Sequence, residues 1–303
     1  MTALNPSDFP ACAACGADEW TVVHDGPIRD GSFGRERDAV IARCGGCGVD
    51  RLAESVCLNL RDYEQPTYRD KLHQSHKADK HQREHDELAR FTLETMWPTS
   101  LRGLTVADFG CGGGVLLDHL RGTAGTLIAI EPNELFGASL TERGYDWHRS
   151  GTAAVEAYPE GADILVSTQV IEHVDDPYGF LQEVYALLKP GGRAIISTPN
   201  REDILMEMLP DNFPPFFYRT QHRWSFHARS LVACAERADL TVLEMRHVHR
   251  YGIANALHWL KDKRPSGRTP FPPFDDQIDK LWRSWLEATG RSDNLYLIAE
   301  RPA

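Results

Sequence analysis

A glycine-rich stretch constrains the possible fold of this chain more than any other segment, because it allows a sharp turn in a backbone whose glycines carry no side chains. The sequence Val106-Ala-Asp-Phe-Gly-Cys-Gly-Gly-Gly-Val115 runs from apolar residues into the pattern D-x-G-x-G-x-G, carried by Asp108, Gly110, Gly112 and Gly114. Glycines allow a sharp turn and let a ligand lie against the main chain, and a following helix offers free N–H groups. The pattern predicts a strand, a loop and a helix that bind a polar or anionic small molecule.

The acidic residue at the end of the next apolar segment indicates which kind of molecule the loop binds. Thr126–Ile130 leads into Glu131-Pro132, about twenty residues beyond the first glycine, and such an acid in a doubly wound sheet accepts hydrogen bonds from ribose hydroxyls. A nicotinamide dinucleotide site requires G-x-G-x-x-G, and Val115 occupies the place of its third glycine, which weakens that alternative. A glycine-rich turn without a ligand is the other alternative.

Later segments continue the alternation of strands and helices. Asp163–Ser167 reads as a buried strand, Pro177 begins a helix with an apolar stripe at Phe180, Leu181, Val184, Leu187 and Leu188, and Ala194–Ser197 is a further strand. In order and spacing these motifs resemble class I S-adenosylmethionine-dependent methyltransferases, over about residues 100–247 and the last strand, Asn294–Glu300.

The resemblance implies an α/β fold with a doubly wound, Rossmann-like sheet of seven strands, whose last strand lies antiparallel beside the fifth. It also implies S-adenosylmethionine as the cofactor, with Asp108, Gly110 and Gly112 at its methionine end and Glu131 at its ribose. The adenine contact stays open, because the loop Ser150–Ala153 holds neither an acid nor an amide at the usual place. The implied cofactor-binding residues are Asp108, Gly110, Cys111, Gly112, Gly114, Glu131, Pro132, Gln169 and Val170.

Four of the seven cysteines form two C-x2-C pairs near the N-terminus, each followed by glycine. Two such turns present four thiolates to one Zn²⁺, which stabilises a segment too small for a core of its own. All four ligands are protein groups, so the expected zinc is structural. Disulfide bonds are the alternative, disfavoured in a reduced cytosolic chain. The expected ligands are Cys12, Cys15, Cys44 and Cys47.

Short β-rich runs between the two pairs predict a zinc ribbon over about residues 10–55. A ribbon ahead of this core is similar to an arrangement among bacterial sugar and natural-product methyltransferases. We expect a ribbon module at 1–60, a helical lid or linker at 61–98 and a methyltransferase domain at 99–303. The last is expected to hold a helical insertion at about 251–290. Its tryptophans are expected to pack the insertion down, with lining of the pocket or of a dimer contact as the alternatives; they are Trp259, Trp282 and Trp285.

Residues 67–96 hold neither glycine nor proline and predict a helix, which in similar enzymes folds over the cofactor. This segment contains four histidines, which could bind a metal. A solvent-exposed helix without a metal explains them better, because charges of both signs alternate along the segment. Tyr68, at its start, is a candidate pocket residue. The histidines are His73, His76, His81 and His85.

Three further histidines are candidates for a catalytic base. His173 follows Glu172 just past the fourth strand, where side chains face the ligand crevice, and a neutral imidazole there accepts a proton from a hydroxyl or ammonium. A structural hydrogen bond to the cofactor loop is the alternative for this residue. His222 and His227 lie in the proline-aromatic stretch 211–227, which is expected to be irregular and to cover the substrate.

These features together predict a cytoplasmic methyltransferase (EC 2.1.1) that acts on a small molecule, through oxygen on a sugar or hydroxylated natural-product metabolite. Carbon and nitrogen acceptors remain alternatives, although the chain ends soon after the core, whereas sugar carbon methyltransferases carry a further domain. A net charge of −11 disfavours nucleic acid, and hence an RNA methyltransferase. No apolar run is long enough to span a membrane, and no signal peptide is evident. A cofactor-binding protein without catalysis is the last alternative.

Overall fold

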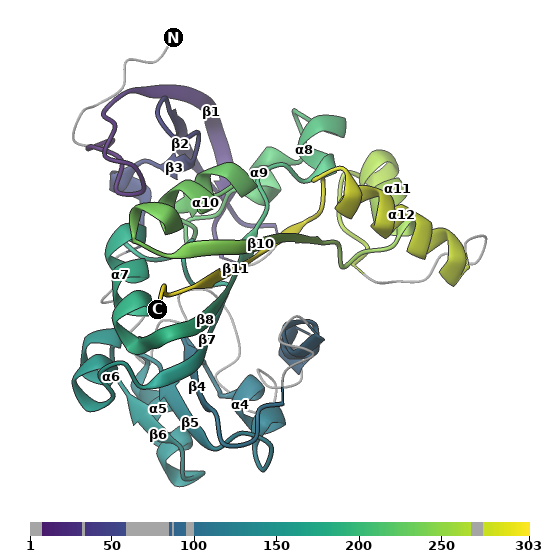
Figure 1. Ribbon diagram of the computed structural model, residues 1–303. Coiled ribbons are helices and arrows are strands. Elements are labelled where there is room, and N and C mark those ends of the chain that lie inside the picture. Colours follow the sequence, from purple (N-terminus) through teal and green to yellow (C-terminus); the bar gives the residue numbers. More distant parts are fainter. Residues whose placement is uncertain (1–7, 32–33, 59–84, 87, 95–99, 268–274) are drawn as a thin grey trace.

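A seven-stranded sheet forms the centre of the computed structural model, which describes residues 8–31, 34–58, 85–86, 88–94, 100–267 and 275–303 (Figure 1). Its order is β10-β11-β8-β7-β4-β5-β6. The strands are β4 (Thr105–Phe109), β5 (Thr126–Ile130), β6 (Asp146–His148), β7 (Ala162–Thr168), β8 (Leu188–Pro199), β10 (Thr241–Val248) and β11 (Asn294–Glu300). The predicted doubly wound α/β sheet is confirmed.

Parallel pairing in the middle of this sheet brings the expected site residues to one edge. The strands β6, β5, β4, β7 and β8 are parallel neighbours, so their carboxyl ends lie together. Both faces of such strands are buried, which explains their continuous apolar runs. As predicted, β11 is antiparallel beside β8, and it also pairs antiparallel with β10.

Helices cover both faces of the sheet. One apolar cluster contains residues of helix α7. The apolar stripe predicted for this helix is confirmed at Phe180, Leu181, Val184 and Leu187, which are buried in the same cluster as Leu165 and Ile196 of the sheet. A second cluster joins α4 to the described residues 88–94. The helices flanking the sheet are α4 (Val115–Leu120), α5 (Glu134–Glu142), α6 (Gly151–Ala157), α7 (Pro177–Leu187) and α10 (Ala228–Arg237).

A second, four-stranded sheet lies near the N-terminus (Figure 1). It consists of β1 (Trp20–Arg29), β2 (Glu36–Cys44), β3 (Asp50–Leu52) and β9 (Trp224–Ser225), all antiparallel, with a short 3-10 helix at Glu54–Val56. The fourth strand therefore comes from residues 224–225, far outside the expected 1–60 module. The first cysteine pair precedes strand β1, and the second lies at the end of β2 and in the turn that follows.

The stretch 211–227 is more regular than its sequence predicts. It forms a short helix, α9 (Pro214–Phe217), and the strand β9, in which Trp224 pairs with Arg51 and is 1% exposed. Neighbouring prolines and aromatic residues favour irregular structure, but pairing with the distant β3 supplies hydrogen bonds that local propensity does not report.

The insertion is helical, as predicted. It holds α11 (Ile253–Asp262) and α12 (Asp276–Ala288), which Figure 1 shows side by side at the end of the β10–β11 pair, next to α8 (Ile204–Met208). The expected helix 67–96 falls largely outside the described residues, as do Tyr68, His73, His76 and His81, and its described part is helical. Across the described helices, none combines the length and hydropathy needed to cross a bilayer.

A buried carboxylate ties the small sheet to the large one. Asp50 is fully buried; its oxygens accept hydrogen bonds from Arg43 at 2.7 Å and from Tyr218 Oη at 2.8 Å, and Arg201 Nε lies 3.6 Å away. Tyr218 and Arg201 belong to the segments that follow β8. Removing this carboxylate would leave the partly exposed guanidinium groups of Arg43 and Arg201 and the buried phenol of Tyr218 without their acceptor.

We expect Asp50→Ala to lower the free energy of unfolding by about 3–5 kcal/mol, because it removes the buried half of these ion pairs. Urea denaturation followed by circular dichroism measures the change. Asp38→Ala, on the exposed end of β2, is the matched control and should shift the unfolding free energy by less than about 0.5 kcal/mol. Equal effects of the two substitutions would contradict the tie between the sheets.

Candidate functional site

The glycine loop after β4 has the conformation that its sequence predicts. Gly110, Gly112 and Gly114 have φ angles of +80°, +51° and +76°, which side chains other than glycine rarely adopt. A Cβ on Gly110 would lie only 2.4 Å from Cγ2 of Val170, in the turn after β7. Glycine at this position thus lets two ends of neighbouring strands pack directly against each other.

Glu131, at the end of β5, holds this loop in place. Its two carboxylate oxygens accept hydrogen bonds from the backbone N–H of Gly112 and of Asn133, both at 2.8 Å. Each carboxylate oxygen can accept more than one hydrogen bond, so this group is of the kind that binds hydroxyl groups. Asp108 lies nearby, and burial together with the charge of Glu131 raises its pKa to about 7.

A cavity of 960 Å³ extends from the glycine loop past the ends of β7 and β8. It contains most of the predicted cofactor-binding residues; Gly114 is not in its lining, although the next residue, Val115, is. Arg149, Ser150 and Gly151 line it near the predicted adenine position, and His85 also reaches it. The predicted residues in the lining are Asp108, Gly110, Cys111, Gly112, Glu131, Pro132, Gln169, Val170, His173 and His222.

The turn after β7 is held in an unusual backbone conformation. Gln169 has a φ of +58°, rare for a residue with a side chain, and its N–H donates to the Ser197 carbonyl at 2.9 Å. Its side-chain amide donates to Asn294 Oδ1 at 3.0 Å. Such conformations concentrate at functional sites, where surrounding contacts maintain them.

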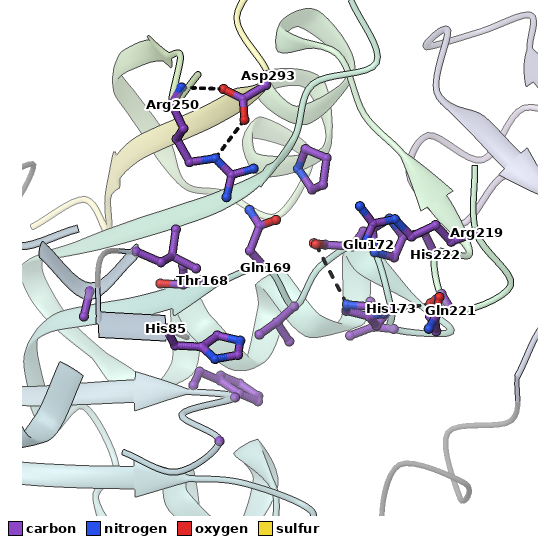
Figure 2. Close-up of a pocket in the computed structure, with 18 of the residues that line it drawn as sticks. His85, Thr168, Gln169, Glu172, His173, Arg219, Gln221, His222, Arg250 and Asp293 are labelled. Atoms are coloured by element: carbon purple, nitrogen blue, oxygen red, sulfur yellow. Dashed lines mark hydrogen bonds and ion pairs between the residues drawn. The ribbon is translucent and has the colours of Figure 1, made fainter. Parts of the chain in front are cut away.

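Glu172 and His173 lie next to each other in this cavity, the first buried and the second partly buried (Figure 2). One oxygen of Glu172 accepts a hydrogen bond from Thr198 Oγ1 at 3.0 Å, and the other lies 3.9 Å from His173 Nε2. His173 Nδ1 is 2.8 Å from the Gln221 carbonyl oxygen, which only accepts, so Nδ1 carries the proton and Nε2 the lone pair. Burial raises the pKa of Glu172 to about 8 and lowers that of His173 to about 4.

His222 completes a cluster with this pair. Its ring contacts the ring of His173 edge-on, with centroids 4.8 Å apart, and burial and the charge of Arg219 lower its pKa. Glu172, His173 and His222 each offer one ligand atom, all within 4.8 Å, so the cluster has the ligands for a divalent metal. The positive charge of Arg219 opposes a second cation at this place.

His227 lies away from these residues and does not line the cavity. It caps α10, with Nδ1 2.7 Å from Ser230 Oγ, and is 3% exposed. A Cβ on Gly48, beside the second cysteine pair, would lie 3.1 Å from its ring. The structure thus places this candidate base between the two sheets, where it has packing and capping contacts.

Several residues of the cavity were missed from the sequence. Arg219, Arg250 and Asp203 lie in its wall, and the insertion contributes Trp259, which is 2% exposed and packs against aromatic residues as predicted. The sequence signal at Arg219 is weak: a single cation after a run of aromatic residues. Nothing local to Arg250 or Asp203 distinguishes them from surface charges.

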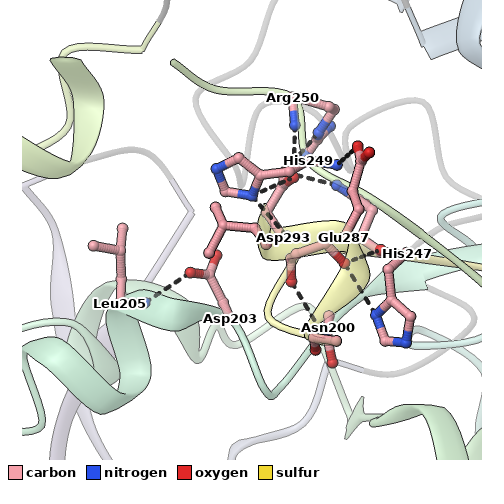
Figure 3. A network of polar contacts seen from close by, with 12 residues as sticks. Asn200, Asp203, Leu205, His247, His249, Arg250, Glu287 and Asp293 are labelled. Atoms are coloured by element: carbon pink, nitrogen blue, oxygen red, sulfur yellow. Dashed lines mark hydrogen bonds and ion pairs between the residues drawn. The ribbon is translucent and has the colours of Figure 1, made fainter. Parts of the chain in front are cut away.

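A polar network fixes the insertion to the end of β8 (Figure 3). Asn200 donates to the carbonyls of Gly290 and Ser292, and Arg250 donates to Asp293 through both its backbone N–H and its Nε. Asp203 caps α8 by accepting from the Leu205 N–H at 2.8 Å. The network holds the aromatic insertion beside the cavity. Within it, the Asp293 carboxylate forms an ion pair with Arg250.

The four cysteines of the two pairs converge as predicted. Their sulfur atoms all lie within 4.8 Å of one another, with 3.8 Å between Cys12 and Cys47 and 3.4 Å between Cys15 and Cys44. Zn–S bonds of about 2.3 Å place neighbouring sulfurs of a tetrahedron about 3.8 Å apart. None of the four forms a disulfide. The residues fit a structural zinc ion.

Comparison with known proteins gives a consistent result. A family model described as a methyltransferase domain matches residues 46–245. The ubiquinone biosynthesis O-methyltransferase of Caulobacter vibrioides is 36% identical over 121 residues, covering 38% of this chain and 48% of that protein. The enzyme of the same name from Aeromonas salmonicida is 30% identical over 173 residues, covering 51% of this chain and 70% of that protein. The chain therefore spans about half the length of the first relative.

Among solved structures, one similar chain comes from the complex between the Haloferax volcanii Trm112 methyltransferase activator and a methyltransferase. It superposes with a TM-score of 0.50 at 18% identity, covering 75% of this chain and 96% of that one. At this identity the likeness concerns the fold.

The cysteine cluster leads to a direct prediction. The purified protein should hold one zinc ion per chain, measured by inductively coupled plasma mass spectrometry, and Cys44→Ser should lose it because three thiolates bind more weakly than four. Cys57→Ser is the matched control, since Cys57 lies in the same module but outside the cluster and should keep the zinc. Full zinc content in Cys44→Ser would rule out the site.

Proposed function

The chain belongs to the methyltransferase domain family, and we propose that it is an S-adenosylmethionine-dependent methyltransferase that methylates a hydroxyl oxygen of a sugar or other hydroxylated natural-product metabolite. One observation carries the proposal: a single cavity joins the glycine loop and Glu131 to Glu172 and His173. Both relatives described above are O-methyltransferases by name, which supports oxygen as the acceptor.

The glycine loop and Glu131 fit the proposed cofactor. Asp108, Gly110 and Gly112 would hold the methionine part, and the Glu131 carboxylate, at the end of β5, would accept from the ribose hydroxyls. S-adenosylmethionine supplies a methyl group already activated by its sulfonium charge. The chain must therefore align the acceptor, exclude water and remove a proton.

We assign the proton transfer to His173. The bond to Gln221 fixes its tautomer, so Nε2 presents its lone pair beside Glu172, and there it would take the proton of the acceptor hydroxyl as the new O–CH₃ bond forms. An ionised Glu172 would stabilise the resulting imidazolium. His222 would support the ring edge-on, and His227 is left out because it does not line the cavity.

Native mass spectrometry with S-adenosylhomocysteine, followed by transfer of a radiolabelled methyl group to a panel of hydroxylated metabolites, tests this function. We expect one nucleoside bound per chain and label in at least one hydroxyl compound. Binding without any transfer would favour a cofactor-binding protein, and label on amines alone would move the acceptor to nitrogen.

Glu131→Ala should weaken binding of S-adenosylhomocysteine at least tenfold, because it removes both the ribose acceptor and the bond that holds Gly112. Isothermal titration calorimetry measures the dissociation constant. Glu142→Ala, on the exposed end of the following helix, is the control and should bind like wild type. An unchanged dissociation constant in Glu131→Ala would exclude its assigned role.

The raised pKa of Glu172 predicts how the rate depends on pH. Below about pH 8 the carboxyl group is protonated and does not stabilise the imidazolium, so kcat/KM should rise about tenfold per pH unit up to that value. Glu172→Gln should be slower and lack this rise, which separates the enzyme from any titration of the acceptor. A wild-type profile that is flat between pH 6 and 9 would contradict the pairing.

A further inference from the structure

In the part of the cavity around Glu172 and His173, one side chain has a charge that no described residue pairs with. Arg219 lines the cavity, and its Nε is buried without a hydrogen-bond partner. Among the described residues no carboxylate lies within ion-pair distance of it. Arg250, by contrast, lines the same cavity but is paired with Asp293 (Figure 3).

The neighbouring acids do not neutralise this guanidinium. Burial raises the pKa of Glu172 to about 8 and, together with the charge of Asp293, raises that of Asp203 to about 8, so both are neutral at pH 7. Burial and the charge of Arg250 lower the pKa of Arg219 to about 10, which still leaves it charged. Arg219 therefore keeps a positive charge that neither Glu172 nor Asp203 balances.

The backbone around Arg219 is fixed rather than loose. It pairs with Arg29, whose carbonyl accepts from the Thr220 N–H at 3.1 Å and whose N–H donates to the Tyr218 carbonyl at 3.1 Å. In Figure 2 Arg219 lies with Glu172, His173 and His222 on one side of Gln169. Burying a cation without a partner is costly, and a ligand that supplies the partner removes that cost.

We propose that Arg219 binds an anionic oxygen group, a carboxylate or phosphate, on the methyl acceptor while the acceptor hydroxyl lies at His173. The proposal rests on the proposed function and narrows its substrate class to hydroxylated acids. A guanidinium matches both oxyanions with two parallel hydrogen bonds. Phe213, Phe216 and Trp259 in the same wall suit an apolar or ring-shaped body.

Binding to protein saturated with S-adenosylhomocysteine tests this proposal. The probes are 4-hydroxybenzoate and 4-hydroxyphenyl phosphate, with 4-hydroxybenzamide as the neutral analogue, measured by isothermal titration calorimetry. At least one anion should bind at least tenfold more tightly than the amide, and which one does distinguishes carboxylate from phosphate. Arg219→Gln should weaken anion binding about 10- to 100-fold and leave binding of the amide unchanged. Arg219→Lys should weaken anion binding less than Arg219→Gln does.

Arg29→Gln is the matched control, because Arg29 is also a partly buried arginine without a carboxylate partner in the described structure, but it stacks on Phe216 and does not line the cavity. Because Phe216 itself lines the cavity, Arg29→Gln should change anion and amide binding alike and keep the wild-type preference for the anion. The melting temperature of Arg219→Gln should be equal to or above that of wild type, since an unpaired buried charge is removed.

Three results would overturn the proposal: no anion binding by cofactor-loaded wild-type protein, equal affinities for anions and amide, or an equal loss of the anion preference in Arg29→Gln. The proposed function fails in a different way. If S-adenosylhomocysteine and an anion both bind but no hydroxylated acid is methylated, the result supports the anion site at Arg219 and contradicts the proposed methyl transfer.

Discussion

The close packing of Gly110 against Val170 is the contact on which the rest of the site depends. Because β4 and β7 are adjacent parallel strands, the loop after one and the turn after the other meet at the same edge of the sheet. A side chain on Gly110 would separate them. Direct contact keeps the cofactor loop beside the turn that begins with Gln169, and that turn carries Glu172 and His173 into the cavity.

The features that the sequence predicts well are those encoded within one short segment. The glycine pattern requires positive φ angles, which the loop has, and the spacing of the two cysteine pairs was sufficient to place four sulfurs together. The acid after β5 was assigned to ribose from its position alone; its bond to Gly112 adds a second role, because a loop without side chains needs an outside partner. Local chemistry determines such features, so local patterns reveal them.

The features that the sequence does not predict arise from contacts between distant segments. β9 is a strand because β3 lies beside it, and His227 caps α10 next to Gly48 although its position in the sequence suggested a catalytic residue. The unpaired charge of Arg219 becomes visible only when the acids among the described residues around it have been located. A single sequence shows the residue types in such cases, but not which of them already have partners.

The small sheet also shapes the acceptor wall, which gives the cysteine cluster an indirect part in the site. Side chains of the segment 218–223 divide between two neighbours: Tyr218, Thr220 and Arg223 bind Asp50, Asp30 and Glu54 of the small sheet, whereas Arg219, Gln221 and His222 line the cavity. Contacts with the small sheet and its flanking residues therefore fix one side of the segment 218–223, and the other side faces the cavity. Because the glycine loop and Glu131 make no use of this segment, the ribbon should influence acceptor recognition more than cofactor binding.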